Sequence, residues 1–581
     1  MSELPPPPPP PALPPDGVAP PPGPEVRRPS RHLRAFAVGG AAVVVAVAAA
    51  GGILALRAFH GSGDSLVSMV PGDAALYVNV NFDPPASQKL AVQGLLNKFP
   101  ALNDQTRSAT VNGWLDTALS TTGLNHDDVS PWLGSEMSIA LPASGLAAST
   151  LAGGGGSSAS PAVIVLIASK DDGKAQAALD KFRNGPVGRV DQWTTSVHDG
   201  VTVTSGSGSA GAYAITNHTV IFASSADAAA AVIDTAQGKR ANLQSASGYT
   251  KVESQLPADR LGLFYVDVPA VVRQLSSSIG STSTGQSALN GAQAYGPLGV
   301  ALVASSDGIA LDGTENYDTS KLTADQRTQL GLAPHTNGSL AFVPRTALGM
   351  LALTGLQQTL TSVLTTVAPA GSAIDSMLRQ FGVTGSGGII THLSGDAGIE
   401  VDQSPGQSVP AGALMFGTDS TAAAQSFLDN LMSSVCRQTD ACDPSRVTTQ
   451  IDQGVTISSV PVSGVGGSGV EPSWAVSNGW AIIGSSPDEV RAVLDSHASG
   501  SGITTSPAYQ AVTSHVGTSN NGMFYVDVPA VLSAIRRALP PDAQASYDSG
   551  AAPYLNHFGA LELSEQNASD HVTFSLFVGI R

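Results

Sequence analysis

Charged side chains are scarce in this chain, and basic ones are the scarcer. Of its 581 residues only 13% are charged, where about a quarter is usual for a soluble domain. Lys and Arg number 28 against 45 Asp and Glu, which gives a formal net charge of −17. Nucleic acids and anionic lipid head groups both bind through a surplus of Lys and Arg. The composition therefore excludes nucleic acid as a partner and disfavours anionic head groups for the folded part.

Residues that hold metals and cofactors are also few. Two cysteines exclude a disulfide-stapled scaffold and a Cys-rich zinc or iron–sulfur protein. The eleven histidines are scattered, without the His-x-x-x-His spacing of a zinc site. Aromatic residues make up 5%, which argues against a dedicated carbohydrate-stacking surface. We therefore predict no cofactor and no resident metal.

Sequence signatures of nucleophilic catalysis are missing too. No Gly-x-Ser-x-Gly occurs, although a hydrolase nucleophile usually lies in such a strand-to-helix turn. Ser225 and Ser486 do lie at predicted strand-to-helix junctions, where capping of the helix explains them better. His218 lies near the first junction, but Gly479 takes its place at the second. A non-enzymatic protein is favoured, and an extracytoplasmic hydrolase with residues distant in sequence remains the alternative.

The chain begins with a proline-rich tail. Fourteen of its 39 prolines lie between Pro5 and Pro29, including an unbroken run from Pro5 to Pro11. Proline lacks the amide donor that helices and sheets need, so residues 1–34 are predicted to be disordered with polyproline II character. A solvated spacer is the favoured interpretation, and a ligand for a proline-binding module is the alternative.

An uncharged apolar segment, Ala35–Leu56, follows the tail. As a helix its 22 residues would be about 33 Å long, enough for a hydrocarbon core of about 30 Å. Four arginines lie between residues 27 and 34, whereas the other flank begins with Arg57 alone. The positive-inside rule therefore predicts a single-pass transmembrane helix over residues 35–57, with a cytoplasmic tail and an extracytoplasmic remainder. A cleaved signal peptide is the alternative, but the length of the segment favours an uncleaved anchor.

The remainder of the chain contains an internal repeat. The octapeptide FYVDVPAV at Phe264–Val271 recurs unchanged at Phe524–Val531, 260 positions later. Seven positions around it also match at a nearly constant spacing. Near-constant spacing over such a distance indicates tandem duplication. We place the first ectodomain repeat at residues 64–325 and the second at residues 326–581.

Each repeat alternates strand and helix patterns. Ala162–Ser169 is a β-branched apolar run that leads into a helical pattern at Asp172–Phe182. Val201–Thr204 and Tyr213–Thr216 form a hairpin-like pair around a Gly/Ser loop. Two-residue periodicity mixed with amphipathic helices predicts an α+β fold. We expect a duplicated domain, each copy a largely antiparallel sheet with helices packed on one face.

The start of the ectodomain resembles a known family. The resemblance is carried by Met69–Val80 (MVPGDAALYVNV), Asp83-Pro84, Gln88-Lys89, Phe99-Pro100 and Ser130–Gly134 (SPWLG). These residues resemble the bacterial domain-of-unknown-function family 3352, whose members are typically single-pass or secreted actinobacterial proteins. The resemblance implies an extracytoplasmic location and covers the ectodomain. It carries over no activity and no catalytic residues.

Asp267 and Asp527 are the most informative acidic residues. Both lie in Tyr-Val-Asp-Val-Pro, where a strand ends and a proline-initiated helix begins. Each carboxylate is expected to cap its own helix near the positive end of the dipole. The alternative is a cation site that the two carboxylates share across a pseudo-twofold interface.

Cys436 and Cys442 enclose five residues after a predicted helix. Outside the membrane oxidation is permitted, so a local disulfide is predicted. The chain-entropy model gives it a stabilisation of about 2 kcal/mol. A redox-active pair would have the Cys-x-x-Cys spacing, which is absent here.

Together these features predict a membrane-anchored protein of the cell envelope. The expected partners are the membrane, through Ala35–Leu56, and an unidentified envelope protein or ligand. The expected role is binding or scaffolding.

Overall fold

The structure is a computed structural model. It describes residues 64–99, 113, 116, 119, 122–145, 162–186, 188–190, 192–207, 211–279, 292–367, 371–385, 387–403, 410–439, 442–462 and 471–581. The predicted tail and the predicted transmembrane span lie outside these residues. Among the helices of the described part, none has the length and apolar character needed to cross a membrane.

The described residues form one sheet of twenty strands, in which every pairing is antiparallel. The first half of the chain supplies β1 (Ala74–Asn81), β2 (Leu133–Pro142), β3 (Ile164–Ser169), β4 (Trp193–His198), β5 (Val201–Gly206), β6 (Ala212–Thr216), β7 (Thr219–Ala223), β8 (Gly262–Val266), β9 (Tyr295–Ser305) and β10 (Gly308–Tyr317). The second half supplies β11 (Gly349–Leu353), β12 (Leu393–Asp402), β13 (Ala411–Thr418), β14 (Thr448–Asp452), β15 (Val455–Ser459), β16 (Ser473–Ser477), β17 (Trp480–Gly484), β18 (Gly522–Val526), β19 (Phe558–Asn567) and β20 (His571–Ile580).

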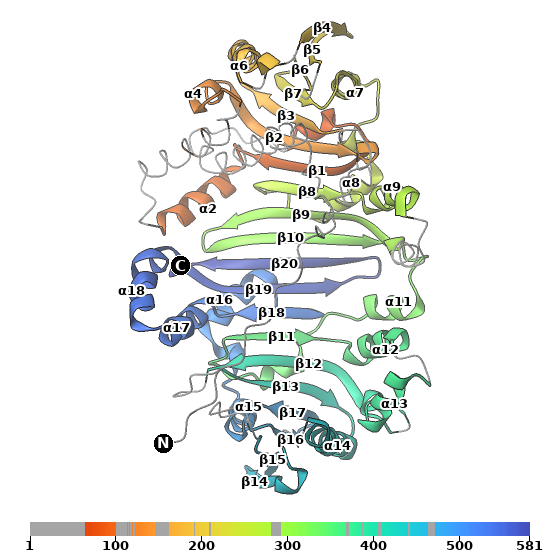
Figure 1. Ribbon diagram of the computed structural model, residues 1–581, viewed down its shortest axis with the longest axis vertical. Helices are drawn as coiled ribbons and strands as arrows, with labels where there is room; N and C mark the ends of the chain where they lie inside the picture. Colours follow the sequence, from red (N-terminus) through yellow and green to blue (C-terminus); the bar gives the residue numbers. More distant parts are fainter. Residues whose placement is uncertain are drawn as a thin grey trace, which may run out of the picture.

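The helices frame this sheet (Figure 1). Those of the first half are α2 (Ala86–Asn97), α4 (His126–Val129), α6 (Asp172–Asn184), α7 (Ala226–Ala236), α8 (Ser247–Glu253) and α9 (Val268–Ile279). Those that follow are α11 (Ala324–Leu330), α12 (Leu356–Val367), α13 (Ala373–Gln380), α14 (Thr421–Thr439), α15 (Pro487–Ser499), α16 (Pro507–Val516), α17 (Val528–Ala538), α18 (Pro541–Gly550) and α19 (Ala552–Leu555). The predicted α+β class is confirmed. The boundary expected at residue 325/326 falls inside α11.

The two halves have the same strand order. In the first half the strands follow one another as β4-β5-β6-β7-β3-β2-β1-β8-β9-β10. In the second half they follow as β14-β15-β16-β17-β13-β12-β11-β18-β19-β20. β10 pairs with β20 over nine residue pairs, so the halves share one continuous sheet.

Helix starts follow from short polar side chains. The side chain of Ser225 accepts a hydrogen bond from the amide of Ala228 at the start of α7, at 3.2 Å. The side chain of Ser486 accepts one from the amide of Glu489 at the start of α15, at 3.1 Å, and Pro487 occupies the first helical position. These caps satisfy amides that have no partner within the helix.

The outer strands of each half are covered on both faces, which corrects the expectation of helices on one face. In the first half α7 packs against one face of β5, β6 and β7, and α6 buries Ala175 and Leu179 in a separate core on the other face. In the second half α15 and α14 take the corresponding places. Side chains on both faces of these outer strands are therefore apolar, because each strand lies between two layers of helices.

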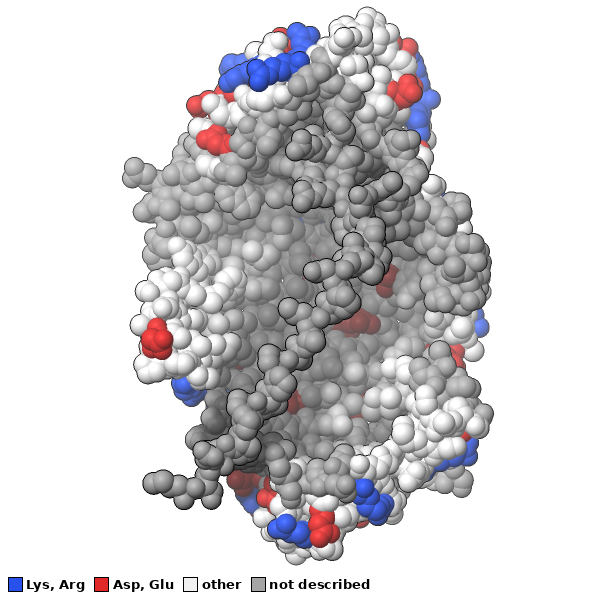
Figure 2. Space-filling model, in the orientation of Figure 1, with Lys and Arg blue, Asp and Glu red and all other residues white. Residues whose placement is uncertain are grey.

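The central strands are covered on one face by α8 and α16. Tyr249 of α8 packs against Tyr265 of β8, and Tyr509 of α16 packs against Tyr525 of β18, each with ring centroids 5.4 Å apart. The other face, which we call the open face, looks toward the viewer in Figure 1, where no labelled helix crosses β9, β10, β20 and β19. In the same orientation the molecular surface is hollowed across these strands (Figure 2).

Candidate functional site

The open face carries exposed apolar side chains along most of its width. Phe524 and Tyr525 are neighbours on β18, yet Phe524 is 44% exposed and Tyr525 is fully buried. Successive residues of a strand point to opposite faces, so Tyr525 lies under α16 and Phe524 lies on the open face. The same holds on β8 for Phe264 and Tyr265.

Directly opposed residues form one continuous row across eight neighbouring strands. From β9 to β13 this apolar row consists of Leu302, Leu311, Leu576, Leu563, Phe524, Leu351, Ile399 and Leu414. Six of the eight side chains are between 37% and 47% exposed. Seven strand spacings of about 4.8 Å give the row a length of about 34 Å.

A contiguous apolar surface of this kind is uncommon on a folded protein. Single exposed apolar residues are ordinary, whereas extended patches mark surfaces that contact a ligand, a membrane or another protein. Leu353 and Val401 widen the row on β11 and β12, and they are 40% and 42% exposed. The open face is therefore the first candidate site.

A cavity of about 320 Å³ lies where the two halves meet at the edge of the open face. It is lined by Ala294, Tyr295, Tyr317, Leu322, Gln326, Gln329, Leu330, Leu353, Thr354, Leu356, Thr359, Asn521, Gly522, Glu565, Asn567 and Val572. We call it the junction cavity. Leu353 belongs to both the cavity and the open face, so the two form one continuous site.

The polar groups of the junction cavity include a carboxylate and an amide oxygen that is left without a described donor. The pKa of the Glu565 carboxyl is raised, first by burial and then by the negative charge of Glu315. Glu315 itself accepts a hydrogen bond of 2.6 Å from the hydroxyl of Tyr317. Gln329 holds a buried Oε1 atom that accepts no hydrogen bond from the described residues. The cavity thus combines apolar walls with acceptor atoms that receive few hydrogen bonds from the described part of the protein.

A second cavity, of about 340 Å³, lies at the start of the described chain and is lined in part by Asp64 and Tyr249. Asp64 accepts hydrogen bonds from the hydroxyls of Tyr77, at 2.6 Å, and Tyr249, at 3.2 Å. Burial is the main cause that raises the pKa of Asp64 to about 6. Nearby, Glu136 accepts from the amide and the hydroxyl of Ser65. These bonds attach the first described residues to the sheet, which is a structural role.

Asp267 and Asp527 are far apart in the sheet. They follow β8 and β18, which are antiparallel to each other and separated by five strand spacings, or about 24 Å. Each carboxylate accepts a hydrogen bond of 3.0 Å from the amide three residues later, Ala270 or Ala530. This is the geometry of a helix cap, and the separation leaves no shared cation site for the pair.

Removing either cap should destabilise the protein slightly. We expect Asp267→Ala and Asp527→Ala each to lower the free energy of unfolding by about 1 kcal/mol, and Asn to restore most of the loss because it keeps the acceptor oxygen. The losses should add in the double variant, since the two helices share no contact partner at the caps. Urea unfolding with and without calcium measures both effects. A calcium-dependent rise in melting temperature that either substitution removes would contradict the capping role.

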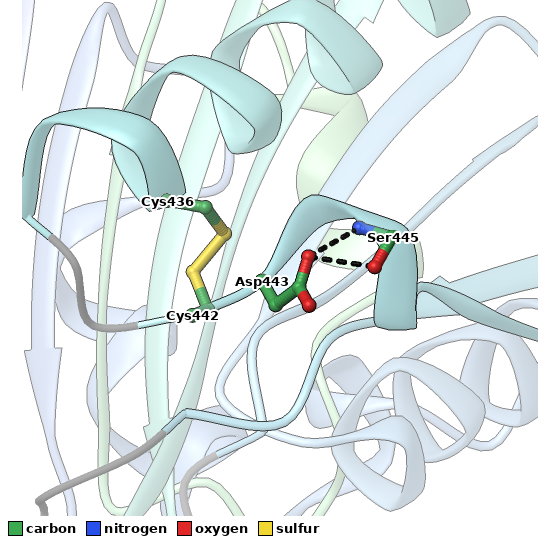
Figure 3. Close-up of a disulfide and its surroundings, with 4 residues drawn as sticks. All are labelled: Cys436, Cys442, Asp443 and Ser445. Atoms are coloured by element: carbon green, nitrogen blue, oxygen red, sulfur yellow. Dashed lines mark hydrogen bonds between the residues drawn. A yellow bond between two sulfur atoms is a disulfide. The ribbon is translucent and has the colours of Figure 1, made fainter.

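Cys436 and Cys442 are joined by a disulfide that ties the end of α14 to the following chain (Figure 3). Beside it, Asp443 accepts hydrogen bonds from the amide and the hydroxyl of Ser445, at 2.9 Å and 2.7 Å. Cys436 is buried in the core under α14. The bridge therefore anchors a loop of the outer part of the second half, away from the open face.

The serines and histidine of the hydrolase alternative have structural partners. Ser225 and Ser486 cap helices, as described above. The Oγ of Ser485 accepts a hydrogen bond from the amide of Gly412, at 3.1 Å. His218 is 84% exposed and pairs with Asp172 at 3.0 Å. No described contact joins these serines to the histidine.

One cluster of potential metal ligands comprises His198, Asp199 and Asp234. His198 Nε2 lies 2.7 Å from Asp234, and Lys239 Nζ lies 2.7 Å from Asp199. The ammonium of Lys239 already supplies the positive charge, and the bonds tie the β4–β5 turn to α7. The sequence spacing did not reveal this cluster, because its members come from separate elements.

The second half contains two buried carboxyl groups whose burial no sequence pattern predicted. Glu400 of β12 is 1% exposed, and Glu489 of α15 is fully buried. Burial is the largest cause that raises the pKa of Glu400, and the neighbouring Glu489 raises it further. The corresponding positions of the first half, three residues into α7 and on β2, are Ala228 and Ala140. The carboxyl pair is therefore a feature of one half alone.

Among solved structures, the chain is similar to three crystal forms of TP0453. For forms I, IV and III the identities are 11%, 9% and 11% and the TM-scores 0.21, 0.23 and 0.22. The matches cover 44–46% of this chain and 79–85% of the TP0453 chains. At these TM-scores the likeness supports no statement about fold or function.

A search of curated proteins finds no match. The model of DUF3352, described as a protein of unknown function, matches residues 37–578. That range includes β1 to β19 and all but the last two residues of β20, together with the segment Met69–Val80 that suggested the resemblance. The chain therefore belongs to the DUF3352 family of proteins of unknown function.

Proposed function

We propose that this protein is a membrane-anchored, extracytoplasmic binding protein that holds the acyl chain of an amphiphile on its open face. The apolar row is the observation that carries the proposal. Eight directly opposed apolar residues form a strip about 34 Å long, and none of the helices that the structure describes lies over the strands that carry its centre. Burial of each CH₂ group of a ligand there would contribute about 0.8 kcal/mol.

An acyl chain suits this surface better than a polypeptide does. The central strands already pair their backbone groups with both neighbours, so they offer few free hydrogen-bond partners. A protein partner would need roughly one hydrogen bond per 100–200 Å² of interface. A hydrocarbon chain needs none, and its burial depends on apolar contact alone.

The anchor and the location belong to the same proposal. The uncharged segment Ala35–Leu56 and the four arginines before it support a single-pass helix with a cytoplasmic tail. The described residues begin at Asp64, seven residues after Arg57. In this arrangement the open face would lie outside the cytoplasm, within reach of the lipids of the envelope.

We further attribute the two halves to a tandem duplication. The repeated octapeptide, the identical strand order and the equal tyrosine pairs under α8 and α16 support this origin. The pairs Tyr249–Tyr265 and Tyr509–Tyr525 have interplanar angles of 67° and 71°. Such agreement in detail is expected of copies and is improbable for unrelated halves.

Polar substitutions in the apolar row should weaken binding of a twelve-carbon amphiphile. All twenty strands of the sheet lie within residues 64–581, so this segment contains the open face and serves for the test. We expect dodecyl maltoside, below its micelle concentration, to bind saturably in isothermal titration calorimetry. The variant with Ile399→Asn and Leu563→Asn should bind at least about tenfold more weakly, a loss of about 1.4 kcal/mol or more.

The matched control is Ile451→Asn. Ile451 lies on β14, outside the open face, and is 77% exposed. The Ile451→Asn variant should bind dodecyl maltoside with the affinity of the unsubstituted protein. All variants should keep their melting temperature, because the substituted side chains are partly exposed to water. Equal affinities of the face variant and the control, or no binding of dodecyl maltoside at all, would overturn the proposal.

A further inference from the structure

We infer that the junction cavity receives the head group of the bound amphiphile and that this head group carries an ammonium. The inference rests on the proposed function and adds the chemistry that the site selects. It draws on the position of the cavity, its charge, its hydrogen-bonding groups and its aromatic wall.

The position of the cavity suits a head group. Leu353 lies two residues from Leu351 of the apolar row on β11, so both point to the open face. Leu353 and Gly522, which are directly opposed on β11 and β18, both line the cavity. Glu565 is directly opposed to Gly522 and continues this wall onto β19. A chain lying along the row can therefore place its polar end in the cavity without leaving the sheet.

The charge of the cavity is negative. Glu565 lines it and Glu315 lies close enough to raise the pKa of Glu565. Among the described lining residues there is no Lys and no Arg. Acidic side chains are visible within the hollow of this face (Figure 2). A phosphate or carboxylate head group would meet repulsion here, whereas a cation would meet attraction.

The hydrogen-bonding groups also favour a donor. Asn521 donates to the carbonyl of Leu332, at 3.0 Å, and Asn567 donates to the carbonyl of Gln329, at 2.9 Å. These amide donors are thus engaged within the protein. The buried Oε1 of Gln329 accepts no hydrogen bond from the described residues, and the carboxylate of Glu565 is exposed. A ligand that brings N–H or polarised C–H donors satisfies both.

An aromatic wall completes the site. Tyr295 and Tyr317, which are directly opposed on β9 and β10, have ring centroids 5.5 Å apart at an interplanar angle of 45°. Both line the cavity. Tyrosine faces attract ammonium groups within about 6 Å of the ring centroid, and the attraction grows where water is excluded. A carboxylate beside two tyrosines is a combination that recognises ammonium groups.

Three amphiphiles with the same twelve-carbon chain test the head group. Dodecyltrimethylammonium, dodecyl maltoside and dodecanoate are titrated below their micelle concentrations into residues 64–581 at pH 8. We expect the ammonium compound to bind at least about tenfold more tightly than the maltoside, and dodecanoate to bind most weakly. In Glu565→Gln the ammonium preference should disappear while maltoside affinity stays the same.

Asp127→Asn is the control for overall charge. Asp127 is exposed and lies outside both sites, and its substitution by Asn removes the same single negative charge. Attraction by the negative net charge of the whole segment would survive both substitutions equally, so a preference lost only in Glu565→Gln assigns it to the cavity. If Glu565→Gln fails to fold, Tyr295→Leu serves instead, and it should reduce ammonium binding alone.

The outcomes separate the two proposals. Chain binding that Ile399→Asn with Leu563→Asn weakens, but with equal affinity for all three head groups, overturns the ammonium inference and leaves the open face as the site. Binding of none of the three compounds overturns the proposed function itself. An ammonium preference that persists in Glu565→Gln also overturns the inference.

Discussion

Replacing both Glu400 and Glu489 by glutamine should raise the melting temperature at pH 8 and leave it almost unchanged at pH 4. In the unfolded chain the glutamate carboxyl titrates near its ordinary value of 4.5. In the folded protein burial and the neighbouring acid raise the pKa of Glu400 well above that value. Between the two values the folded state binds more protons than the unfolded state does.

The direction of the pH dependence follows from this difference. Stability is greatest below pH 4.5 for this group, and it falls as the pH rises toward the raised pKa, by up to about 1.4 kcal/mol per pH unit. Glutamine cannot ionise, so the double variant should lose this dependence. At pH 8 we expect it to be more stable than the unsubstituted protein by roughly 2–4 kcal/mol.

The first half of the chain provides a second variant. Ala140 and Ala228 occupy the positions that correspond to Glu400 and Glu489. The variant with Glu400→Ala and Glu489→Ala therefore has the same residues at these positions as the first half of the chain. Its melting temperature should also fall less steeply between pH 5 and 8 than that of the unsubstituted protein, and the remaining slope comes from other buried carboxyls such as Asp64 and Glu562. Asp127→Asn, at an exposed position, should keep the slope of the unsubstituted protein. Parallel pH profiles for all variants would show that the pair is not protonated in the folded state.

Removing β20, residues 571–581, should cost more stability than any single core substitution. β20 pairs with β10 on one side and with β19 on the other, and it buries Phe577 and Ile580. Its loss leaves two unpaired strand edges in the middle of the sheet and uncovers part of the core under α16. We expect a loss of more than about 5 kcal/mol, comparable to the whole stability of a small domain.

Calorimetry measures this effect. The complete chain should unfold in one transition because the sheet is continuous, whereas the truncated chain should melt at lower temperature and associate through its exposed edges. Deletion of Arg581 alone is the control. This exposed residue adds no strand pairing and donates only two described hydrogen bonds, to the carbonyl of His557 at 2.8 Å and to that of Asn556 at 3.1 Å. An unchanged melting temperature after removal of residues 571–581 would show that β20 does not join the halves.

Local elements of the fold could be predicted from the sequence. The hairpin-like pair Val201–Thr204 and Tyr213–Thr216 identified β5 and β6, and the predicted strand-to-helix junction identified the cap at Ser225. The repeated octapeptide located β8 and β18 together with their helices. These features depend on neighbouring residues, so a pattern of a few positions contains the information.

Long-range features could not be predicted in this way. Nothing local shows that β10 pairs with β20, because almost the whole second half of the chain lies between them. Alternation along Phe524 and Tyr525 shows two apolar faces but does not show which one a helix covers. Glu400 resembles a surface residue in the sequence, and its burial follows only from the position of α15.

The pairing of β10 with β20 also determines when folding can finish. The chain is synthesised from its N-terminus, so β1 to β10 have left the ribosome long before β20 is made. Until residue 580 arrives, β10 keeps a bare edge and the first half stays without its neighbour. Contacts between such distant segments form slowly, since the ends of a long loop must meet first. The protein therefore passes through an interval in which β10 is open to pairing with another chain, and assistance during that interval would matter more for its yield than the stability of the finished sheet.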